Sequence, residues 1–226
     1  MGEMKGRLIV LEGTDGSGKS TQFERLCERV SKEGPAYRQL VFPQYQEDSS
    51  ALLRMYLRGE FGKHSGDVNA YAASSFYAVD RYASWKKMWQ GWYEAGGLVI
   101  ADRYTTSNAV HQGSKVSLQE RGDFFRWLSD FEYRCLGLPE PDLVIYLDMP
   151  TEKAVKMLRR REALTHTKGD IHETDTTYLA ACRQTALEAA GVYGWCRVSC
   201  LNREGNVRSV EDIHEEIWGH VRPILG

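Results

Sequence analysis

The pattern G-x-x-x-x-G-K-[ST] is matched in full by Gly13-Thr14-Asp15-Gly16-Ser17-Gly18-Lys19-Ser20. The apolar run from Leu8 to Leu11 precedes it, and the amphipathic pattern of Ser20 to Glu33 follows it. This order predicts a buried strand, a glycine-rich turn and a helix whose N-terminus points at a bound phosphate. The pattern therefore predicts a loop, reaching to Thr21, that cradles the phosphates of ATP or a similar nucleotide.

Each part of this loop has an expected task. Glycines let the backbone N–H groups turn inward around phosphate oxygens, and the helix N-terminus adds partial positive charge. Lys19 is expected to reach the β- and γ-phosphates, and the Ser20 hydroxyl is expected to bind Mg²⁺. The loop predicts a bound nucleotide, but by itself it specifies no reaction.

The rest of the chain alternates short apolar runs with longer helical patterns, which is typical of a parallel sheet covered on both faces. We therefore expect one three-layer α/β domain over residues 1–226, with a five-stranded parallel sheet flanked by helices. Further strands are expected at Gln39–Phe42, Leu98–Ala101, Leu143–Leu147 and Arg197–Ser199. Helices are expected at Ser50–Arg58, Val68–Tyr93, Glu120–Arg134, Glu152–Arg161, Thr177–Tyr193 and Val210–Val221.

Composition excludes several classes of protein. Hydrophobic residues make up 42% and charged residues 27% of the 226 positions, as in ordinary globular domains and unlike disordered or collagen-like chains. The formal charge of −2 indicates neither a nucleic-acid partner nor an acidic membrane surface. No signal peptide or membrane span is expected, because no run of about 18 apolar residues occurs. The five cysteines include no C-x-x-C pair, which predicts free thiols in the cytoplasm.

A second charged motif, Asp102-Arg103-Tyr104, follows the expected third strand directly. Ligands of parallel sheets bind at the carboxyl ends of strands, where this motif and the glycine-rich loop meet. Asp102 is placed to hold Mg²⁺ through water, and Arg103 is suited to bidentate contact with a phosphate. The chain has no N-K-x-D and no L-S-G-G-Q motif, so a switch GTPase and a transport ATPase are disfavoured. A kinase acting on a small molecule fits best.

At this point the sequence resembles the thymidylate kinase family, which has a P-loop kinase fold with a short lid. The resemblance covers roughly residues 6 to 200, in family order and spacing. It rests on Leu11 to Gln22, Phe42-Pro43, Asp80-Arg81, Asp102-Arg103-Tyr104-x-x-Ser107-Asn108 and Gly137-Leu138-Pro139-x-Pro141-Asp142. The family transfers the γ-phosphoryl of ATP to dTMP with Mg²⁺, and its members are usually cytoplasmic homodimers.

The resemblance implies a role for each matching residue. Asp15 would accept a hydrogen bond from the deoxyribose 3′-hydroxyl and lie near the metal. Arg103 would hold the acceptor phosphate. Arg81 would read the carbonyl edge of thymine, and Tyr77 would stack on the base. The remaining implied contacts to dTMP are an apolar wall from Phe42 and Pro43, help at the phosphate from Tyr45, and a pocket lined by Ser107, Asn108, His111 and Gln112.

One departure concerns the sugar. The family commonly carries A-Y-Q after D-R-Y-x-x-S, whereas this chain has Val110-His111-Gln112. His111 therefore replaces the tyrosine that usually crowds the 2′ position of the sugar, which leaves the choice between deoxyribose and ribose open.

The expected lid spans approximately residues 159–174 and resembles the lid of the family, with Asp170 and Glu173 in place of its acidic residues. The family has two arrangements of its catalytic arginine, one after the Asp of the loop and one in the lid. Because Gly16 occupies the loop position, the resemblance points to the lid form. One or more of Arg159, Arg160 and Arg161 would then supply the cation that neutralises the moving phosphoryl.

Two other functions remain open from the residues alone. A nucleotide-binding switch would need no second phosphate site, so Arg81 and Arg103 disfavour it. A deoxynucleoside kinase needs a general base near the 5′-hydroxyl, and Glu12-Gly13 does not discriminate between the two kinases. The D-R-Y-x-x-S set and the lid acids favour the monophosphate kinase. The aromatic stretch from Tyr71 to Tyr93 fits either a homodimer face or a buried helix.

Overall fold

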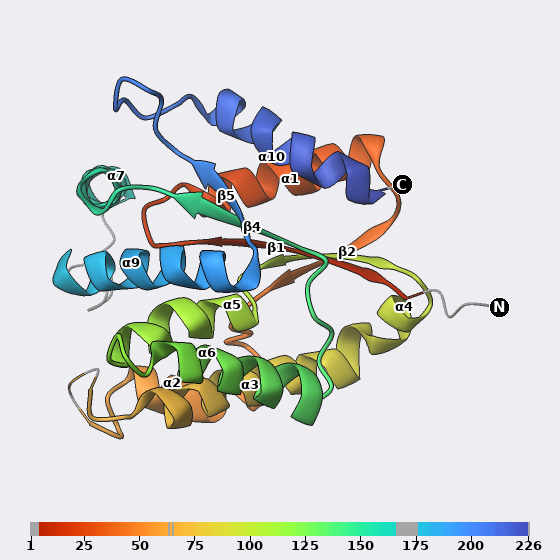
Figure 1. Cartoon of the computed structure of the whole chain (residues 1–226). Coiled ribbons are helices and arrows are strands. Elements are labelled where there is room, and N and C mark those ends of the chain that lie inside the picture. Colours follow the sequence, from red (N-terminus) through yellow and green to blue (C-terminus); the bar gives the residue numbers. More distant parts are fainter. Residues whose placement is uncertain (1–4, 63, 65, 166–175, 226) are drawn as a thin grey trace.

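The computed structural model describes residues 5–62, 64, 66–165 and 176–225, and in them five parallel strands form one sheet. The strand order β2-β3-β1-β4-β5 places β1, which leads into the glycine-rich loop, at the centre (Figure 1). The register pairs Leu11 of β1 with Asp102 of β3, so both charged motifs leave the same edge of the sheet. The strands are β1 (Arg7–Gly13), β2 (Tyr37–Val41), β3 (Leu98–Asp102), β4 (Leu143–Asp148) and β5 (Cys196–Ser199).

Helices cover both faces of the sheet (Figure 1). On one face α1 (Lys19–Glu33) and α10 (Val210–Leu225) pack on Ile9 and Leu11, and on the other Leu8 and Val10 face a second core. This alternation along β1 follows from the two-residue period of a strand and makes the centre of the sheet apolar on both sides. The second face carries α3 (Ala70–Ser84), α6 (Arg121–Ser129) and α9 (Thr176–Tyr193).

The remaining helical segments are short, except for α7 (Thr151–Thr165), which has 15 residues. They are η1 (Asp48–Ser50), α2 (Ala51–Leu57), η2 (Trp85–Trp89), α4 (Gln90–Glu94), α5 (Thr105–Ser107), η3 (Asn108–Gln112), η4 (Gly113–Lys115) and η5 (Asp130–Cys135). Of these, η2, η3 and η5 are π-helical, and such turns are frequent at functional sites.

The fold class predicted from the sequence is confirmed, and the main differences from the predicted elements are three. The second strand ends at Val41, although the Phe42 amide still donates to the Asp102 carbonyl at 3.0 Å. The long helical pattern of residues 68–93 is interrupted by π-helix η2. The segment 105–115 is helical and was not predicted, because its α, π and 3₁₀ pieces share no single period.

The G-L-P-x-P-D motif sits where it was expected, at the entry to β4. Asp142 locks this entry to β1, since its carboxylate accepts the Leu8 amide at 2.7 Å and its amide donates to the Leu8 carbonyl at 2.9 Å. The motif therefore fixes the sheet at the end opposite the glycine-rich loop. None of the helices in the described part of the chain has the length and hydropathy needed to span a membrane.

Candidate active site

The glycine-rich loop joins β1 to α1 and turns tightly. Gly16 and Gly18 have φ values of +79° and +84°, a region that side-chain-bearing residues rarely adopt. A Cβ on Gly16 would also lie 2.5 Å from the carbonyl oxygen of Ala154 on α7. Position 16 therefore needs a glycine for both backbone conformation and space, and α7 packs directly on the loop.

Lys19 and Asp102 form an ion pair at the base of the loop, with 8% and 12% of their side chains exposed. Burial and the charge of Arg103 lower the pKa of Lys19, and the carboxylate of Asp102 only partly offsets them. Asp102 thus holds the lysine beneath the loop, in a position from which its ammonium group can meet an incoming anion.

Arg103 lies beside two carboxylates where the two motifs meet. Its Nη2 donates to Asp15 Oδ1 at 2.6 Å, and its Nη1 lies 3.6 Å from Glu12 Oε1. Its backbone φ of +65° is unusual for a residue other than glycine, and such strain is frequent at functional sites. Burial disfavours the charged guanidinium, but Asp15 and Glu12 outweigh it and raise the pKa of Arg103, which stays a cation.

Glu12 is fully buried behind Arg103 and is held by hydrogen bonds on both oxygens. Oε1 accepts the Gly13 amide at 2.9 Å, and Oε2 accepts the hydroxyls of Thr106 at 2.7 Å and Ser107 at 2.6 Å. Burial alone would raise the pKa of Glu12, but Arg103, Lys19 and these hydrogen bonds lower it below its ordinary value. Glu12 is therefore an ionised anchor for Arg103 and for the segment after β3.

Two cavities meet at Arg103. One, of about 490 Å³, follows the glycine-rich loop, and the other, of about 180 Å³, extends toward α3 and η3. We call them the donor cavity and the acceptor cavity. Both are lined by Asp15, Phe42, Pro43, Tyr45 and Arg103, so a group bound in one lies next to a group bound in the other.

The structure brings the residues predicted from the sequence to these two cavities. The donor cavity is lined by Thr14, Asp15, Gly16, Ser17, Gly18, Lys19, Ser20 and Thr21, while Gly13 is buried beneath them. The acceptor cavity is lined by Asp15, Phe42, Pro43, Tyr45, Tyr77, Arg81, Arg103, Ser107, Asn108, His111 and Gln112. Tyr104 of the D-R-Y motif also lines it, and sequence reasoning missed three further lining residues, namely Tyr56, Leu57 and Tyr178.

The apolar wall of the acceptor cavity comes from the end of β2. Phe42 is buried and packs on Tyr104, with ring centroids 5.9 Å apart. The Phe42–Pro43 peptide bond is cis. Asp80 on α3 fixes the loop that follows, because its carboxylate accepts the Gln44 amide at 2.8 Å and the Ser49 hydroxyl at 2.7 Å. The Asp of the D-R pair therefore shapes the wall, and only its Arg faces the cavity.

The far end of the acceptor cavity is polar. Arg81 is 2% exposed and pairs with the fully buried Glu132 of η5, its Nε donating to Oε2 at 2.6 Å. Asn108 donates to the same carboxylate at 3.1 Å. Gln112 also lines this end, and its Oε1 is buried without a hydrogen-bond partner among the described residues. Burial raises the pKa of the neighbouring Tyr77 hydroxyl, which therefore stays protonated.

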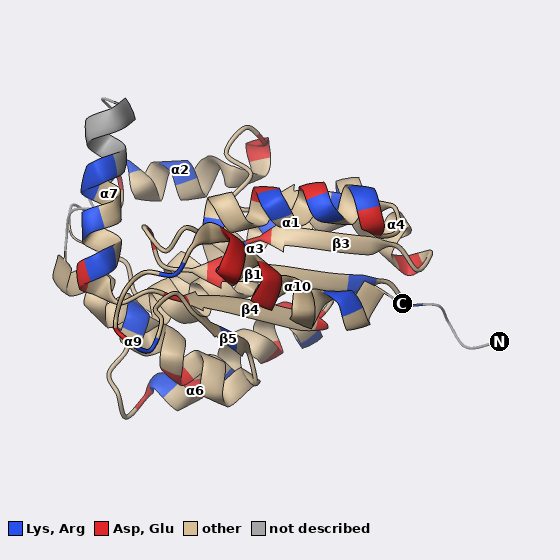
Figure 2. Ribbon diagram, turned by 90° about the horizontal axis from the view of Figure 1, so that it is seen from above, with Lys and Arg blue, Asp and Glu red and all other residues tan. Residues whose placement is uncertain are grey.

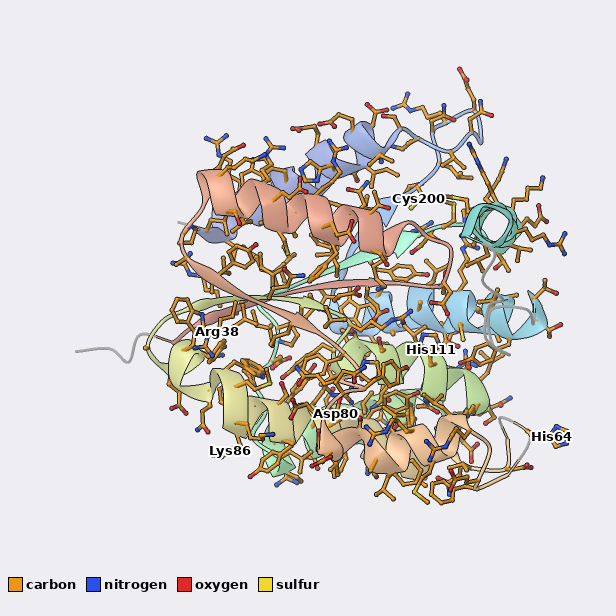
Figure 3. The ribbon with its side chains drawn as sticks, turned by 180° about the vertical axis from the view of Figure 1, so that it is seen from behind. Arg38, His64, Asp80, Lys86, His111 and Cys200 are labelled. Carbon is orange, nitrogen blue, oxygen red and sulfur yellow. The ribbon has the colours of Figure 1, made fainter. Side chains whose placement is uncertain are left out.

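His111 connects Arg103 to α9. Its Nε2 lies 3.0 Å from Arg103 Nη1, and its Nδ1 lies 3.0 Å from the Tyr178 hydroxyl. Figure 3 shows His111 between the ribbon of α9 and the helical run that follows β3. Tyr178 carries no sequence motif, and only the packing of α9 against η3 brings it here.

The helix α7 closes one side of the donor cavity with Met157 and Leu158, and carries basic residues beyond them (Figure 2). Arg159 and Arg160 are exposed at this end. The side chain of Arg161, and the predicted lid acids Asp170 and Glu173, lie outside the described residues.

The side chains that line the donor cavity fit a magnesium ion that binds together with a nucleotide. The described residues contain no group of three or more His, Cys, Asp or Glu side chains placed to hold a metal by themselves. Mg²⁺ in nucleotide sites keeps several waters and takes the rest of its ligands from one or two protein groups and the phosphates. Ser20, exposed at the start of α1, and Asp102, at the end of β3, both line the donor cavity and fit that requirement.

A parallel α/β sheet with a phosphate loop and an adjoining acceptor cavity defines a P-loop nucleoside monophosphate kinase. Comparison with known proteins narrows the class, since the family model described as thymidylate kinase matches residues 11–217. The chain belongs to the thymidylate kinase family, whose members use ATP.

Individual relatives agree with this assignment. The chain is 33% identical to the thymidylate kinase of Mycobacterium tuberculosis over 155 residues, covering 68% of this chain and 71% of the relative. It is 29% identical to a probable thymidylate kinase of Pyrococcus horikoshii over 97% of both chains, and 27% identical to the human thymidylate kinase over 96% of this chain and 90% of the relative. The solved thymidylate kinase of Candida albicans has the same fold, with a TM-score of 0.70 at 21% identity over 97% of this chain and 92% of that one.

Proposed function

We propose that the protein transfers the γ-phosphoryl of ATP to dTMP, giving ADP and dTDP, with Mg²⁺ bound to the nucleotide. The observation that carries this proposal is the shared wall of the donor and acceptor cavities, where Asp15 and Arg103 face both. A nucleotide switch would have no use for the second cavity. The choice of dTMP as the acceptor rests on the thymidylate kinases to which the chain is similar.

The reaction needs positioning and charge neutralisation more than acid–base chemistry. The bond that breaks joins the γ-phosphorus to the bridging oxygen of ATP, and the bond that forms joins it to a phosphate oxygen of dTMP. That phosphate has a second pKa near 6, so it is already mostly ionised at neutral pH and needs no general base. Glu12, ionised and held by hydrogen bonds on both oxygens, does not fit the general base that a deoxynucleoside kinase would need.

Arg103 is proposed to hold the acceptor phosphate. Asp15 and Glu12 keep its guanidinium charged and fix its fork, so less conformational freedom is lost when a phosphate binds. The carboxylate of Asp15 is partly exposed and lines both cavities. It is proposed to accept a hydrogen bond from the 3′-hydroxyl of the sugar. Tyr77 is proposed to stack on the base, and Phe42 is proposed to cover it with an apolar wall. Arg81 is proposed to donate hydrogen bonds to the carbonyl edge of the base.

On the donor side, Lys19 is proposed to exchange Asp102 for the β- and γ-phosphate oxygens when ATP binds. Ser20, and Asp102 through water, would hold Mg²⁺, which draws charge from the phosphates when bound. A lid over approximately residues 159–174 is proposed to bring Arg159, Arg160 or Arg161 to the moving phosphoryl and to exclude water. Residues 1–226 are proposed to act as one domain with this lid.

We also propose that the protein is a homodimer that uses the outer face of α3. Val79 and Tyr82 are 49% and 41% exposed there, and Tyr71 is exposed on the same helix. Large apolar side chains spaced along one helix face are typical of an interface with a symmetric partner. The five free cysteines fit the reducing cytoplasm, which is the proposed location.

A coupled assay of ADP release tests the substrate assignment. Purified protein, ATP and Mg²⁺ are mixed in parallel with dTMP, dUMP, ribo-TMP, dCMP, dGMP or thymidine. The proposal expects strong turnover with dTMP and weaker turnover with dUMP, since one methyl group is worth about a 10- to 200-fold preference. Turnover with thymidine or dCMP in preference to dTMP would overturn the acceptor assignment and leave the ATP site standing.

A further inference from the structure

One buried carboxylate near the acceptor cavity has no task in the reaction described above. Glu132 lies in π-helix η5, is fully buried, and does not line either cavity. It stands directly behind Arg81 and Asn108, both of which do line the acceptor cavity. A buried carboxylate is costly unless it is paired, so its partners show what it organises.

Glu132 accepts three hydrogen bonds from two residues. Arg81 donates from Nε to Oε2 at 2.6 Å and from Nη2 to Oε1, and Asn108 donates from Nδ2 to Oε1 at 3.1 Å. The second Nδ2 hydrogen of Asn108 has its own acceptor, the backbone carbonyl of Ser74 at 3.1 Å. The two donors of the Asn108 amide are thereby engaged, and its acceptor Oδ1 is the group that remains for the cavity.

This arrangement determines which hydrogen-bonding groups the cavity offers to a base. Arg81 is held on Glu132 by two of its N–H groups and has only donors to offer, whereas both donors of the Asn108 amide are engaged, which leaves its carbonyl oxygen as the group for the cavity. A donor beside an acceptor complements O4 and N3–H of thymine or uracil. Cytosine has the opposite pattern, an amino donor at C4 and an acceptor at N3, and would meet like groups.

We propose that Glu132 is a positioning residue that sets base choice, because it orients both Arg81 and Asn108 so that a pyrimidine with O4 and N3–H is accepted and cytosine is rejected. The inference rests on the proposed function, in which the acceptor cavity binds a pyrimidine monophosphate. It adds a residue outside the cavity whose effect passes through two residues inside it.

Replacing the carboxylate by an amide should release the Asn108 side chain. In Glu132→Gln the side-chain amide has one acceptor oxygen and one NH₂ donor group. The oxygen is expected to bind the charged Arg81 in preference to Asn108. Asn108 Nδ2 then faces a donor. Turning the amide over satisfies that donor and points Nδ2 into the cavity, but it sets Oδ1 against the Ser74 carbonyl, so Asn108 is no longer held in one orientation. A donor at that place suits N3 of cytosine, so the variant should lose its preference for dTMP over dCMP.

The test measures dissociation constants of dTMP, dUMP and dCMP by calorimetry, and kcat/KM for the same nucleotides. A site that hydrogen-bonds one base is expected to reject the mismatched one by about 10⁴-fold, and Glu132→Gln should reduce the dTMP-to-dCMP ratio by about 10- to 100-fold. The dTMP-to-dUMP ratio should stay within about threefold of wild type, because the two bases share O4 and N3–H and differ by a methyl group.

The matched control is Glu188→Gln, which removes the partner of another arginine of low exposure, Arg121, whose Nη1 donates to Glu188 Oε2 at 2.7 Å. Neither residue lines the acceptor cavity. A general loss of stability would lower binding of the three nucleotides together in both variants. If Glu132→Gln leaves the dTMP-to-dCMP ratio unchanged, Glu132 only stabilises the fold and the proposal is wrong.

If Glu132→Gln does not fold, Glu132→Asp replaces it. The shorter carboxylate keeps its charge beside Arg81 but does not reach both partners, so the ratio should fall by at least about threefold, and an unchanged ratio again contradicts the proposal. Failure of the proposed function is a separate result. A wild-type protein that binds dTMP and does not phosphorylate it would overturn the kinase assignment. The dissociation constants would still test whether Glu132 sets the preference for dTMP over dCMP.

Discussion

Arg103 and His111 are joined by a hydrogen bond of 3.0 Å at the edge of the acceptor cavity. A guanidinium only donates, so Nε2 of His111 accepts, and the hydrogen of the neutral ring lies on Nδ1, next to the Tyr178 hydroxyl. The position that the family commonly gives to a tyrosine therefore serves here to orient the arginine proposed to hold the acceptor phosphate.

Removing this acceptor should weaken acceptor binding selectively. His111→Phe keeps a flat ring but leaves one N–H of Arg103 without its partner, which costs about 1–2 kcal/mol. We expect KM for dTMP to rise by about 5- to 30-fold with KM for ATP within about twofold. Steady-state kinetics with each substrate varied in turn measures both. His220→Phe, on the exposed side of α10, is the control, and an equal rise of both KM values would show that His111 acts on the whole fold.

Arg103 should not tolerate even a conservative change. Lysine keeps the charge but loses the planar fork that contacts Asp15 and His111 together. We expect Arg103→Lys to lower kcat/KM for dTMP by about 10²- to 10³-fold, with an unfolding temperature near that of wild type. Arg134→Lys, at an exposed pair with Asp130, should change kcat/KM by less than about twofold. Full activity of Arg103→Lys would exclude Arg103 from the phosphate site.

Gly16 should be irreplaceable because of α7. An alanine there adds strain at φ +79° and a contact of 2.5 Å with the Ala154 carbonyl, so Gly16→Ala must move α7 off the loop. We expect KM for ATP to rise by about tenfold or more and the protein to lose about 1–3 kcal/mol of unfolding free energy. The control Gly219→Ala lies in open space on α10 and should stabilise by about 0.5–1 kcal/mol. A Gly16→Ala protein with wild-type affinity for ATP would contradict the packing described.

Lys115 should make stability depend on pH in an alkaline window. Its ammonium group lies 2.7 Å from the Tyr56 hydroxyl, and burial lowers its pKa from 10.5 to about 8. Between these two values the unfolded chain binds a proton that the folded protein has released, so unfolding free energy rises with pH. Below the folded value both states are protonated and the cost of burying the charge is constant.

The comparison with Lys115→Met isolates this effect. From about pH 7 to about pH 10, wild type should gain roughly 1 kcal/mol relative to the variant, a figure reduced for partial exposure to solvent. Urea unfolding at several pH values measures the difference. A difference that stays flat, or that favours the variant more as pH rises, would show that Lys115 is not held in an apolar setting.

The thiols should differ in reactivity. Cys135 is exposed, whereas burial raises the pKa of Cys27 and Cys182 to about 11 and of Cys200 to about 12. Because the thiolate is the reactive form, a disulfide reagent at about pH 8 should label Cys135 rapidly and the three buried thiols only on unfolding. Cys196 is partly buried, so Cys135→Ser can still react at that one thiol, and rapid labelling of more than one thiol in this variant would contradict the burial of the other three.

The sequence predicted those parts of the site that belong to contiguous motifs. Lys19 and Arg103 follow strands within a few residues, so the register of a parallel sheet brings them together without further information. The lining residues Tyr56 and Tyr178 lie on helices with no motif, and only tertiary packing places them in the cavity. The role of Glu132 was not predicted from the sequence for the same reason, because a glutamate near the end of a helical pattern is most often a solvated surface charge.

Local irregularity explains the boundaries that sequence reasoning missed. The segments 85–89 and 108–112 are π-helical, so the apolar residues around them change register and the 3.6-residue period fails. That irregular turn puts Asn108, His111 and Gln112 on the cavity side together. These three residues, which the family resemblance had named, therefore line the acceptor cavity although their helix was not foreseen, and their roles toward a nucleotide stay predictions.

The most direct test of the central claim is to identify both products of one reaction. ATP, Mg²⁺ and dTMP are incubated with the protein, and the nucleotides and free phosphate are separated by ion-exchange chromatography over a time course. Phosphoryl transfer to dTMP predicts that dTDP and ADP appear in equal amounts and that little inorganic phosphate forms. ADP accompanied by inorganic phosphate, with no dTDP, would show an ATPase without an acceptor and would contradict it.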